Sequence, residues 1–328
     1  MEQPLPRVLL DDAIGRFLDH RRALGRGYAT EEHILRGVRN FILELGADDL
    51  DQKTFECWSA RTASLSPNTR RARQRTVRLL CLHRRRTEPE CFVPDPLHFA
   101  RPQPYRPPVL VQPEQIARML ACATSAAPTP NSPLRGAVLR LAVVLLYTAG
   151  LRRGEATSLT LGDVDAEAGV VRVRESKFHK SRLVPLSTDA GRELRRYLRT
   201  RELVCDDRRP EAPLLCNRSR GWRGYTGTGL RDAIMGLFDD AGVHDGRGRR
   251  PRVHDLRHSF AVQALTRLYL RGDDVRSRLP HLALYMGHVS IVSTAHYLHF
   301  VPEVAQLASE RFAGKCGHLI EEVADAQP

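Results

Sequence analysis

The chain has 328 residues, of which 51 are Lys or Arg and 38 are Asp or Glu, so its formal net charge is +13. Hydrophobic residues make up 42% and charged residues 27%, values that are typical of a globular protein and argue against long disorder. The longest apolar run, residues 139–147, is broken by Arg140 and is far shorter than the ~20 residues of a bilayer-spanning helix. The seven cysteines are scattered without a CxxC motif. These features argue against membrane-spanning, secreted and disulfide-stapled proteins, and they predict a reduced cytoplasmic protein that binds a polyanion.

Three amphipathic helices are predicted in the N-terminal part of the chain, over residues 11–24, 30–45 and 51–60. Each carries apolar residues at helical spacing, which indicates one buried face. The second is expected to begin at an imperfect capping box, because His33 occupies the position where Glu would complete the pattern that Thr30 starts. Gly46 is a natural end for it.

A fourth helix is expected to start at Ser66 and Pro67 and to present a strongly basic face. Its predicted apolar stripe consists of Val77, Leu79, Leu80 and Leu82. A charge run is usually a solvated face, but no acidic residue is expected to neutralise these arginines from the next helical turn. The guanidinium fork also suits phosphate oxygens. We therefore predict that the helix binds the DNA backbone. The arginines concerned are Arg70, Arg71, Arg73, Arg75, Arg78, Arg84, Arg85 and Arg86.

A proline-rich segment over residues 93–112 predicts an extended linker, since proline at this density suits neither a helix nor a central strand. It divides the chain into an N-terminal helical domain of residues 1–92 and a second domain of residues 113–312. Residues 313–328 would form a C-terminal tail.

The second domain is predicted to be mainly helical with one small β-hairpin. Alternating β-branched residues predict strands over residues 170–174 and 182–186. Helices are expected over residues 114–123, 134–148, 188–203, 230–241, 255–270, 278–286, 293–299 and 302–312. The Arg- and Gly-rich stretch of residues 206–250 carries no motif around its one helical pattern, and we expect it to follow DNA or to be mobile. The fold class is therefore α+β, mainly α with a small β-sheet.

Four separate clusters in this domain contain the residue types that carry chemistry. They are TAGLRRGE at residues 148–155, SKFHKSRLVPL at 176–186, HDLRHSFA at 254–261, and MGH followed by STAHYLH at 286–299. In this order and at these intervals they resemble the boxes of the tyrosine recombinase, or phage integrase, family. Those boxes are G-L-R-x-x-E, a Lys on a β-hairpin, H-x-L-R-H, and L-G-H with a Tyr shortly after.

The resemblance implies an N-terminal four-helix core-binding domain of the SAM-like type and a C-terminal mixed α/β catalytic domain of the DNA breaking-rejoining type. It implies a site-specific recombinase, that is an integrase, transposase or resolvase, which cleaves and rejoins DNA through a 3′-phosphotyrosine intermediate. No metal, ATP or other cofactor is expected. The expected partners are double-stranded DNA and further copies of the chain, from a dimer to a tetramer, alone or with related recombinases. No membrane is expected, and the protein would reside in the cytoplasm at the nucleoid.

Physical chemistry supports several of the implied roles. Arg152 and Arg257 offer two guanidinium forks that suit the oxygens of one phosphodiester, where charge grows in the transition state. Tyr297 would be the nucleophile, and its ordinary pKa of about 10 means that it needs a base and nearby positive charge.

The remaining roles come from motif position. Lys177 would protonate the 5′-oxygen leaving group, His254 would accept a proton, and His288 would donate a hydrogen bond to the phosphate. Glu155 is expected to orient Arg152 or the region of the second box, and His258 to be a structural hydrogen-bonder. The residues alone do not separate the roles of His254 and His288.

Several alternatives stay open at the level of sequence. Lys180 competes with Lys177, and Tyr285 is a rival nucleophile. A type IB topoisomerase-like enzyme would share the chemistry, and a non-catalytic DNA-binding regulator could share the fold. The pair Cys316 and His318 supplies too few ligands for a metal site.

Overall fold

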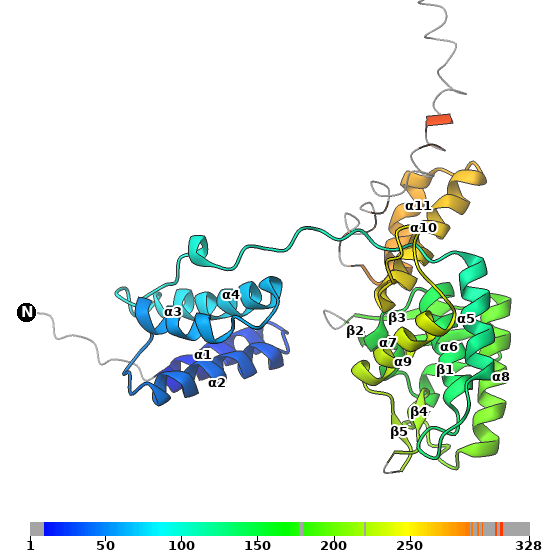
Figure 1. Cartoon of the computed structure of the whole chain (residues 1–328), viewed down its shortest axis with the longest axis horizontal. Coiled ribbons are helices and arrows are strands. Elements are labelled where there is room, and N and C mark those ends of the chain that lie inside the picture. The colour runs from blue at the N-terminus through cyan, green and yellow to red at the C-terminus, as the bar shows by residue number, and fades with distance from the viewer. Residues whose placement is uncertain are drawn as a thin grey trace, which may run out of the picture. The chain divides into compact units, whose positions relative to one another are not determined.

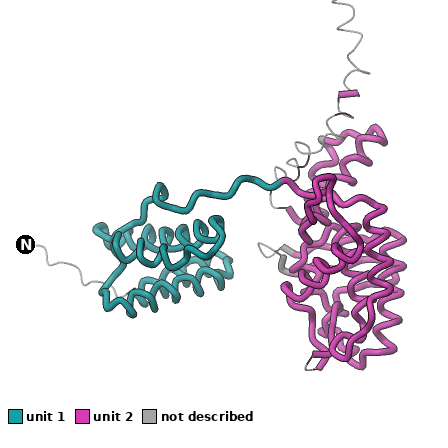
Figure 2. Tube along the Cα trace, in the orientation of Figure 1, with its two compact units in different colours: residues 1–106 teal, residues 107–328 magenta. Residues whose placement is uncertain are grey.

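The computed structural model describes residues 10–176, 180–219, 221–288, 290, 294, 297, 306, 309 and 310. It divides the chain into two compact units, Met1–Arg106 and Pro107–Pro328 (Figure 2). The predicted helices over residues 293–299 and 302–312 lie largely outside the described residues, and the predicted tail lies wholly outside them.

Unit 1 contains four α-helices in its described part (Figure 1). They are α1 (Leu10–Ala23), α2 (Ala29–Glu44), α3 (Gln52–Arg61) and α4 (Pro67–Arg84), followed by a short 3₁₀ turn, η1 (Pro96–His98). Their apolar faces enclose a core that includes Phe17, Leu35 and Leu80, each at most 1% exposed. The Ser66 side chain caps α4 by accepting a hydrogen bond from the Thr69 backbone N–H at 3.3 Å.

The predicted capping box of the second helix is wrong. Helix α2 begins one residue earlier, after Tyr28, whose φ of 51° places it in the left-handed region. No side chain caps this end of the helix. Tertiary packing of the apolar face therefore fixes this boundary, with Tyr28 set edge-on against Phe17 at a centroid distance of 5.8 Å.

Helix α4 corrects the predicted apolar stripe. Val77 and Leu80 are in the core, whereas Leu79 and Leu82 are 37% and 40% exposed. Cys81 takes the third core position instead, because the spacing 77, 80, 81 follows one face of the helix.

The basic face of α4 is smaller than the sequence predicts. Arg84 is 3% exposed and pairs with both carboxylate oxygens of Asp49 at 2.7 Å, and with Glu88, four residues on, at 2.8 Å. The prediction that no acidic residue neutralises the arginines is therefore wrong for Arg84. Three more donate to backbone carbonyls of residues 91–100, namely Arg71, Arg78 and Arg85. The other four donate no side-chain hydrogen bond within the described part of the chain: Arg70, Arg73, Arg75 and Arg86.

The proline-rich segment packs against both units in turn. Phe99 is buried in the core of unit 1, at 5% exposure. Val109 and Val111 are buried in unit 2, where the Val111 N–H donates to the Ser259 hydroxyl at 2.8 Å. Apart from the 3₁₀ turn the segment has no regular structure, as the prolines predict, but its two ends are anchored by burial.

Unit 2 is built around α6 (Arg135–Thr148), an almost wholly buried helix in contact with α5, α8 and α10. The other helices are α5 (Pro113–Ser125), α7 (Arg153–Ser158), α8 (Thr188–Val204), α9 (Gly227–Asp240), α10 (Val253–Leu270) and α11 (Val275–Met286), with the 3₁₀ turn η2 (Leu161–Asp163). An antiparallel sheet of order β1-β2-β3 consists of β1 (Val164–Asp165), β2 (Val170–Ser176) and β3 (Lys180–Pro185). The chain is thus mostly helical with small antiparallel sheets.

The Arg- and Gly-rich stretch is more ordered than expected up to its helix. It forms a second antiparallel sheet from β4 (Cys216–Asn217) and β5 (Arg223–Gly224). Leu214, Leu215 and Cys216 are at most 1% exposed. These three consecutive apolar residues indicate a buried segment, which the Arg- and Gly-rich composition of the stretch as a whole does not predict.

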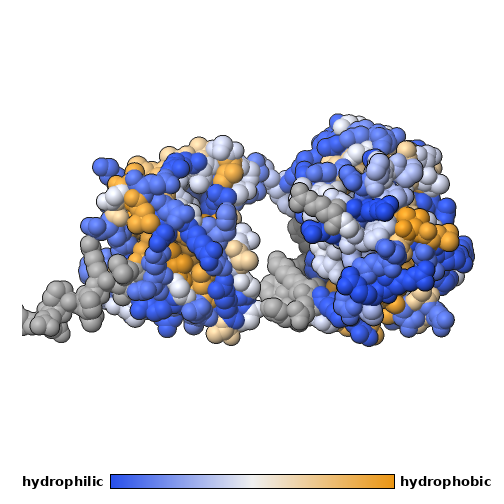
Figure 3. Space-filling view, turned by 90° about the horizontal axis from the view of Figure 1, so that it is seen from below, coloured by the Kyte–Doolittle hydropathy of each residue, from blue (hydrophilic) through white to orange (hydrophobic). Residues whose placement is uncertain are grey.

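Hydrophilic residues cover most of the surface of both units in the view of Figure 3, with smaller hydrophobic areas between them. Within the described residues, no helix combines the length and the apolar character needed to span a membrane.

Candidate active site

The first box of the sequence forms a turn and a helix start. Gly150 has a φ of +60°, and a Cβ there would lie 2.5 Å from the Phe260 ring, so only glycine fits. Arg152 then caps α7, where its backbone N–H donates to Glu155 Oε2 at 2.8 Å and its Nη1 donates to Oε1 at 2.7 Å. The predicted contact between Glu155 and Arg152 is therefore present, and the spacing R-x-x-E is that of a helix cap.

Arg257 lies on the first turns of α10 and is 1% exposed. Its guanidinium donates to the carbonyl oxygens of Gly150 and Met286, the latter at 2.6 Å. Burial, and then the positive charge of Arg152, lower the pKa of Arg257 to about 10. It still carries its proton at neutral pH, so two cations share this part of the unit.

Arg182 on β3 is a site residue that the sequence analysis missed. It donates to both oxygens of Glu155, from Nη1 to Oε1 at 3.0 Å and from Nη2 to Oε2 at 2.9 Å. Burial alone would raise the pKa of Glu155, but the hydrogen bonds from Arg182 and from the Arg152 backbone, with the charge of Arg182, lower it to about 2. Glu155 is therefore a carboxylate shared by several arginines.

The alternation of residues along β3 could have indicated that Arg182 is buried. It occupies the same face of β3 as the buried Val184, whereas Leu183 between them is 61% exposed. The sequence R-L-V-P-L allows either face to be the inner one, and this ambiguity hid a buried arginine.

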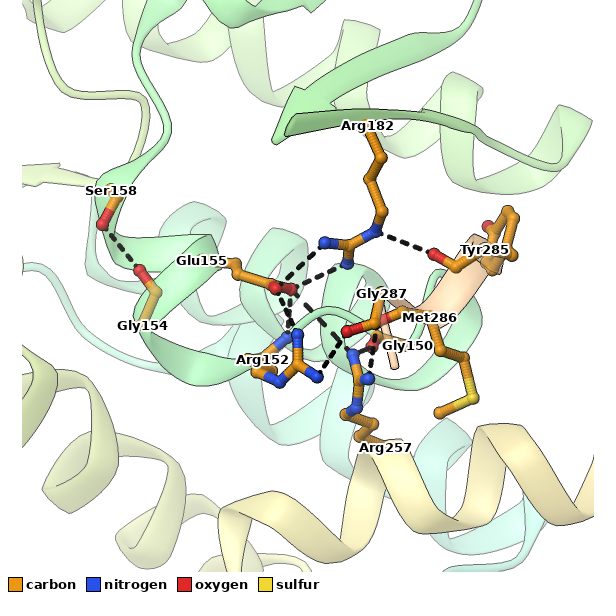
Figure 4. Close-up of polar contacts among 10 residues, drawn as sticks. All are labelled: Gly150, Arg152, Gly154, Glu155, Ser158, Arg182, Arg257, Tyr285, Met286 and Gly287. Atoms are coloured by element: carbon orange, nitrogen blue, oxygen red, sulfur yellow. Dashed lines mark hydrogen bonds and ion pairs between the residues drawn. The ribbon is translucent and has the colours of Figure 1, made fainter. Parts of the chain in front are cut away.

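Arg152, Arg182 and Arg257 all donate hydrogen bonds to the backbone at the end of α11. Three successive carbonyl oxygens each accept a hydrogen bond from a different one (Figure 4). Arg182 Nε donates to Tyr285 at 2.8 Å, Arg257 to Met286, and Arg152 Nη2 to Gly287 at 2.8 Å. The last carbonyls of a helix lack intrahelical donors and carry partial negative charge, so cations stabilise them.

Tyr297 lies among histidines and is 6% exposed. Its hydroxyl is 3.1 Å from Nδ1 of His258, and the two ring centroids are 5.3 Å apart. His254 packs edge-on against His258 at 4.6 Å, and His288 stacks on Tyr297 at 6.2 Å. The imidazole in contact with the tyrosine hydroxyl is thus that of His258, which the sequence analysis treated as a supporting residue.

All three imidazoles are neutral at neutral pH. Burial lowers the pKa of His258 to about 4, with a further contribution from His254. Burial and then the charges of Arg257 and Arg152 lower the pKa of His288 to about 4 as well. The pKa of His254 is also lowered, by burial first and then by the charge of Arg257.

Comparison with known proteins identifies the family. Residues 110–303 match the phage integrase family. A putative integrase/recombinase of Sinorhizobium fredii, y4rE, is 30% identical over 311 residues, which cover 92% of this chain and 95% of the relative. The chain belongs to the phage integrase family. Its members are the tyrosine recombinases, and the XerD tyrosine recombinase of Ralstonia nicotianae is 32% identical over 202 residues, 61% of this chain and 59% of XerD.

Solved structures show the same integrase fold. The Tn1549 transposon integrase, in complex with transposon right end DNA, superposes with a TM-score of 0.63 at 19% identity, covering 93% of this chain and 100% of that one. The XerH site-specific recombinase bound to its difH substrate gives a TM-score of 0.59 at 19% identity, covering 94% and 99%.

The other candidate residues of this integrase-family chain are placed as follows. Lys177 lies outside the described residues, so its competition with Lys180 stays open. Tyr285 donates to the Pro185 carbonyl at 3.0 Å, and burial raises its pKa to about 12, which makes it a poor nucleophile. Cys316 and His318 lie outside the described part, within which no three metal-ligating side chains gather.

Proposed function

We propose that this chain is a site-specific recombinase that cleaves and rejoins duplex DNA through a 3′-phosphotyrosine link on Tyr297. The observation that carries the proposal is the position of the Tyr297 hydroxyl, within hydrogen-bond distance of His258 and within electrostatic reach of Arg257. Family membership supports the reaction class, since the relatives are named recombinases and integrases.

Arg152 and Arg257 are the proposed ligands of the scissile phosphate. Each guanidinium carries five N–H groups, and the contacts of each arginine within the described part of the chain use only some of them. The remaining donors can bind the non-bridging oxygens, whose negative charge grows as phosphorus becomes pentacovalent. Fixed cations stabilise that transition state more than the ground state.

In the proposed step the Tyr297 oxygen forms a bond to phosphorus while the bond from phosphorus to the 5′-oxygen breaks. The phenol proton goes to the imidazole pair of His254, the proposed acceptor, and His258, which is the member within hydrogen-bond distance of the hydroxyl. Lys177 supplies a proton to the leaving 5′-oxygen. We give His258 the task of orienting the phenol through Nδ1. The phosphotyrosine link keeps the energy of the phosphodiester bond that was broken. Attack on this link by a 5′-hydroxyl therefore rejoins a strand without a cofactor.

His288 is the proposed hydrogen-bond donor to the phosphate. Its Nδ1 lies 2.7 Å from the hydroxyl oxygen of Thr294, a residue with no exposed surface. If the hydroxyl donates to Nδ1, the proton of the neutral ring is on Nε2, which can then donate to a ligand. Thr294 would in this way select the tautomer of His288.

Unit 1 is the proposed core-binding domain, which holds the DNA backbone. Arg75 and Arg86 are exposed and donate no side-chain hydrogen bond within the described residues, so they are the best candidates among the eight arginines. Binding to DNA through phosphate contacts is sequence-independent, so base recognition requires other residues. We propose that several copies assemble on the DNA, because strand exchange needs one nucleophile for each strand that is cut.

The test is to trap the covalent intermediate. Randomly nicked fragments of the DNA that flanks the gene are incubated with the protein, and adducts that survive detergent are sequenced. A nick a few nucleotides to the 3′ side of the cleavage position leaves a short segment with a free 5′-hydroxyl. This segment dissociates after cleavage, so the adduct on the 3′-phosphate accumulates. Wild type is expected to form it and Tyr297→Phe to bind DNA without forming it. An adduct with Tyr297→Phe would refute the proposal. Relaxation of a supercoiled plasmid that carries no special site would indicate a topoisomerase. Binding to DNA without an adduct would indicate a non-catalytic regulator.

A further inference from the structure

Arg182 has no part in the chemistry proposed above, and yet all its contacts lie at the site. Its side chain is 8% exposed. Nε donates to the Tyr285 carbonyl, and the two terminal nitrogens donate to the two oxygens of Glu155 (Figure 4). Each of its three nitrogens donates inside the protein, so we look for the role of this arginine in the structure of the site.

The turn after α11 is shaped around Arg182. Gly287 has a φ of +67°, and a Cβ there would lie 2.7 Å from Nη1 and 2.9 Å from Cζ of Arg182. The guanidinium therefore packs directly against this turn. The glycine of the M-G-H segment is needed twice, for its backbone conformation and for the space that Arg182 fills.

A second bond attaches the same strand to the same helix. The Tyr285 hydroxyl donates to the Pro185 carbonyl at 3.0 Å. Strand β3 is thus held to the end of α11 at both Arg182 and Pro185. The strand continues from residues 177–179, which include the proposed proton donor Lys177, and the helix leads into His288.

Glu155 explains why a third arginine is needed. Its side chain is 5% exposed and lies 2.7 Å from Arg152 Nη1 and 3.9 Å from Arg257 Nη1. Without Arg182, a buried carboxylate would draw both phosphate-binding arginines toward itself, because an unpaired buried charge is costly. With Arg182 bound to both oxygens, Arg152 contributes one side-chain nitrogen to Glu155 and extends the other to Gly287.

We infer that Arg182 is a positioning residue for the cleavage reaction. By pairing with Glu155 and holding the 285–287 turn, it sets Arg152, Arg257 and His288 in the arrangement that receives one phosphate. This inference rests on the proposed function, and it assigns a role to a residue of the second cluster to which the sequence analysis assigned none.

The test compares Arg182→Gln with Arg140→Gln. Arg140 is a matched control, because it makes a similar bidentate pair with Glu193, at 2.8 and 2.9 Å, between α6 and α8 of the same unit. The substrate is the nicked duplex recovered in the trapping experiment. We expect R182Q to slow single-turnover cleavage about 100-fold, the effect of a misplacement near 1 Å, while the Kd for DNA changes less than about threefold. R140Q should cleave at the wild-type rate.

A second measurement does not depend on activity. The pKa of His288 is held low by burial and by the charges of Arg257 and Arg152, so a shift of these groups changes it. Histidine titration by NMR, without DNA, should show a higher His288 pKa in R182Q and an unchanged one in R140Q. If wild type forms no adduct, the proposed function fails, and this titration still decides the role of Arg182.

Arg182→Lys guards against a variant that fails to fold. Lysine keeps the charge but cannot bridge both carboxylate oxygens and a carbonyl, so R182K should recover part of the lost rate, about tenfold. The inference is overturned if R182Q matches R140Q in rate and in the His288 titration. It is also overturned if R182K matches wild type in both, since the fork geometry would then be irrelevant.

Discussion

Replacing Glu155 by Gln removes the carboxylate that the site arginines share. The folded protein holds the pKa of Glu155 at about 2, against an ordinary value of 4.5, although burial alone would raise it. That difference corresponds to about 3 kcal/mol of stability at neutral pH. Glutamine keeps the shape of the side chain but leaves Arg182 buried without its anion, which lowers the stability further. For unit 2, residues 107–328, a loss of this size lowers Tm by about 10 °C.

The dependence on pH gives the prediction its sign. Above pH 4.5 the carboxylate is charged in both the folded and the unfolded chain, so the full stabilisation is present. As the pH falls from 4.5 toward 2, the unfolded chain takes up its proton first and the stabilisation is lost. The gap between wild type and E155Q should therefore shrink over this range.

The assay is thermal and urea unfolding of wild type, E155Q and the control E193Q at pH 7 and at pH 3. Glu193 pairs with Arg140 outside the site and is more exposed, at 16% against 5% for Glu155, so E193Q should lose less stability. The reasoning is refuted if E155Q loses under about 1 kcal/mol at pH 7. A gap that is equal at the two pH values would refute it as well.

Three further predictions concern single residues. Gly287→Ala should destabilise the chain by about 2 kcal/mol more than Gly242→Ala in urea unfolding. Both glycines have a positive φ, but of the two only Gly287 has another group within 4 Å of an added Cβ. Equal losses of stability in the two variants would contradict the packing argument. His258→Phe should slow adduct formation about 100-fold, and His258→Asn, whose amide can replace Nδ1, should recover part of the rate; an unchanged rate in the Phe variant would remove His258 from the site. Arg84→Gln should destabilise unit 1 by about 3 kcal/mol, because Arg84 is buried and paired with Asp49 and Glu88. Arg86→Gln should leave the stability of unit 1 unchanged and reduce the salt dependence of DNA binding by about one phosphate contact. The reverse pattern would contradict the division of the basic face.

The helices were predictable because their apolar spacing is a local property. The starts of α3 and α4 follow from Asp51 and Ser66, whose side chains accept hydrogen bonds from the first turn. The start of α2 was not predictable, because Tyr28 adopts a left-handed conformation and packs on Phe17, a residue of another helix. Local capping rules do not include such tertiary contacts.

The candidate site shows the same division. Arg152 and Glu155 are three residues apart, so the sequence alone predicts their contact. Arg182 and Gly287 are more than 100 positions apart, and only the fold shows that a guanidinium fills the space beside that glycine. His258 contacts Tyr297 across 39 positions, a pairing that the motif spacing does not distinguish from one with His254.

The basic helix shows the limit of counting charge. Eight arginines predicted one DNA-binding face, but half of them bond to the protein itself. Arg84 was the clearest case to find in advance, because Glu88 lies one helical turn after it. The partners of Arg71, Arg78 and Arg85 are backbone carbonyls of a later segment, which no pattern of side chains reveals.

The most direct test of the account is to locate the covalent bond in the trapped adduct. The adduct is digested with a protease and a nuclease, and the peptide that retains a nucleotide is sequenced by mass spectrometry. We expect the nucleotide to be attached to Tyr297 through its 3′-phosphate, and the released strand to carry a 5′-hydroxyl. Attachment to Tyr285 or to any other residue, or a 5′-phosphate attachment, would contradict it.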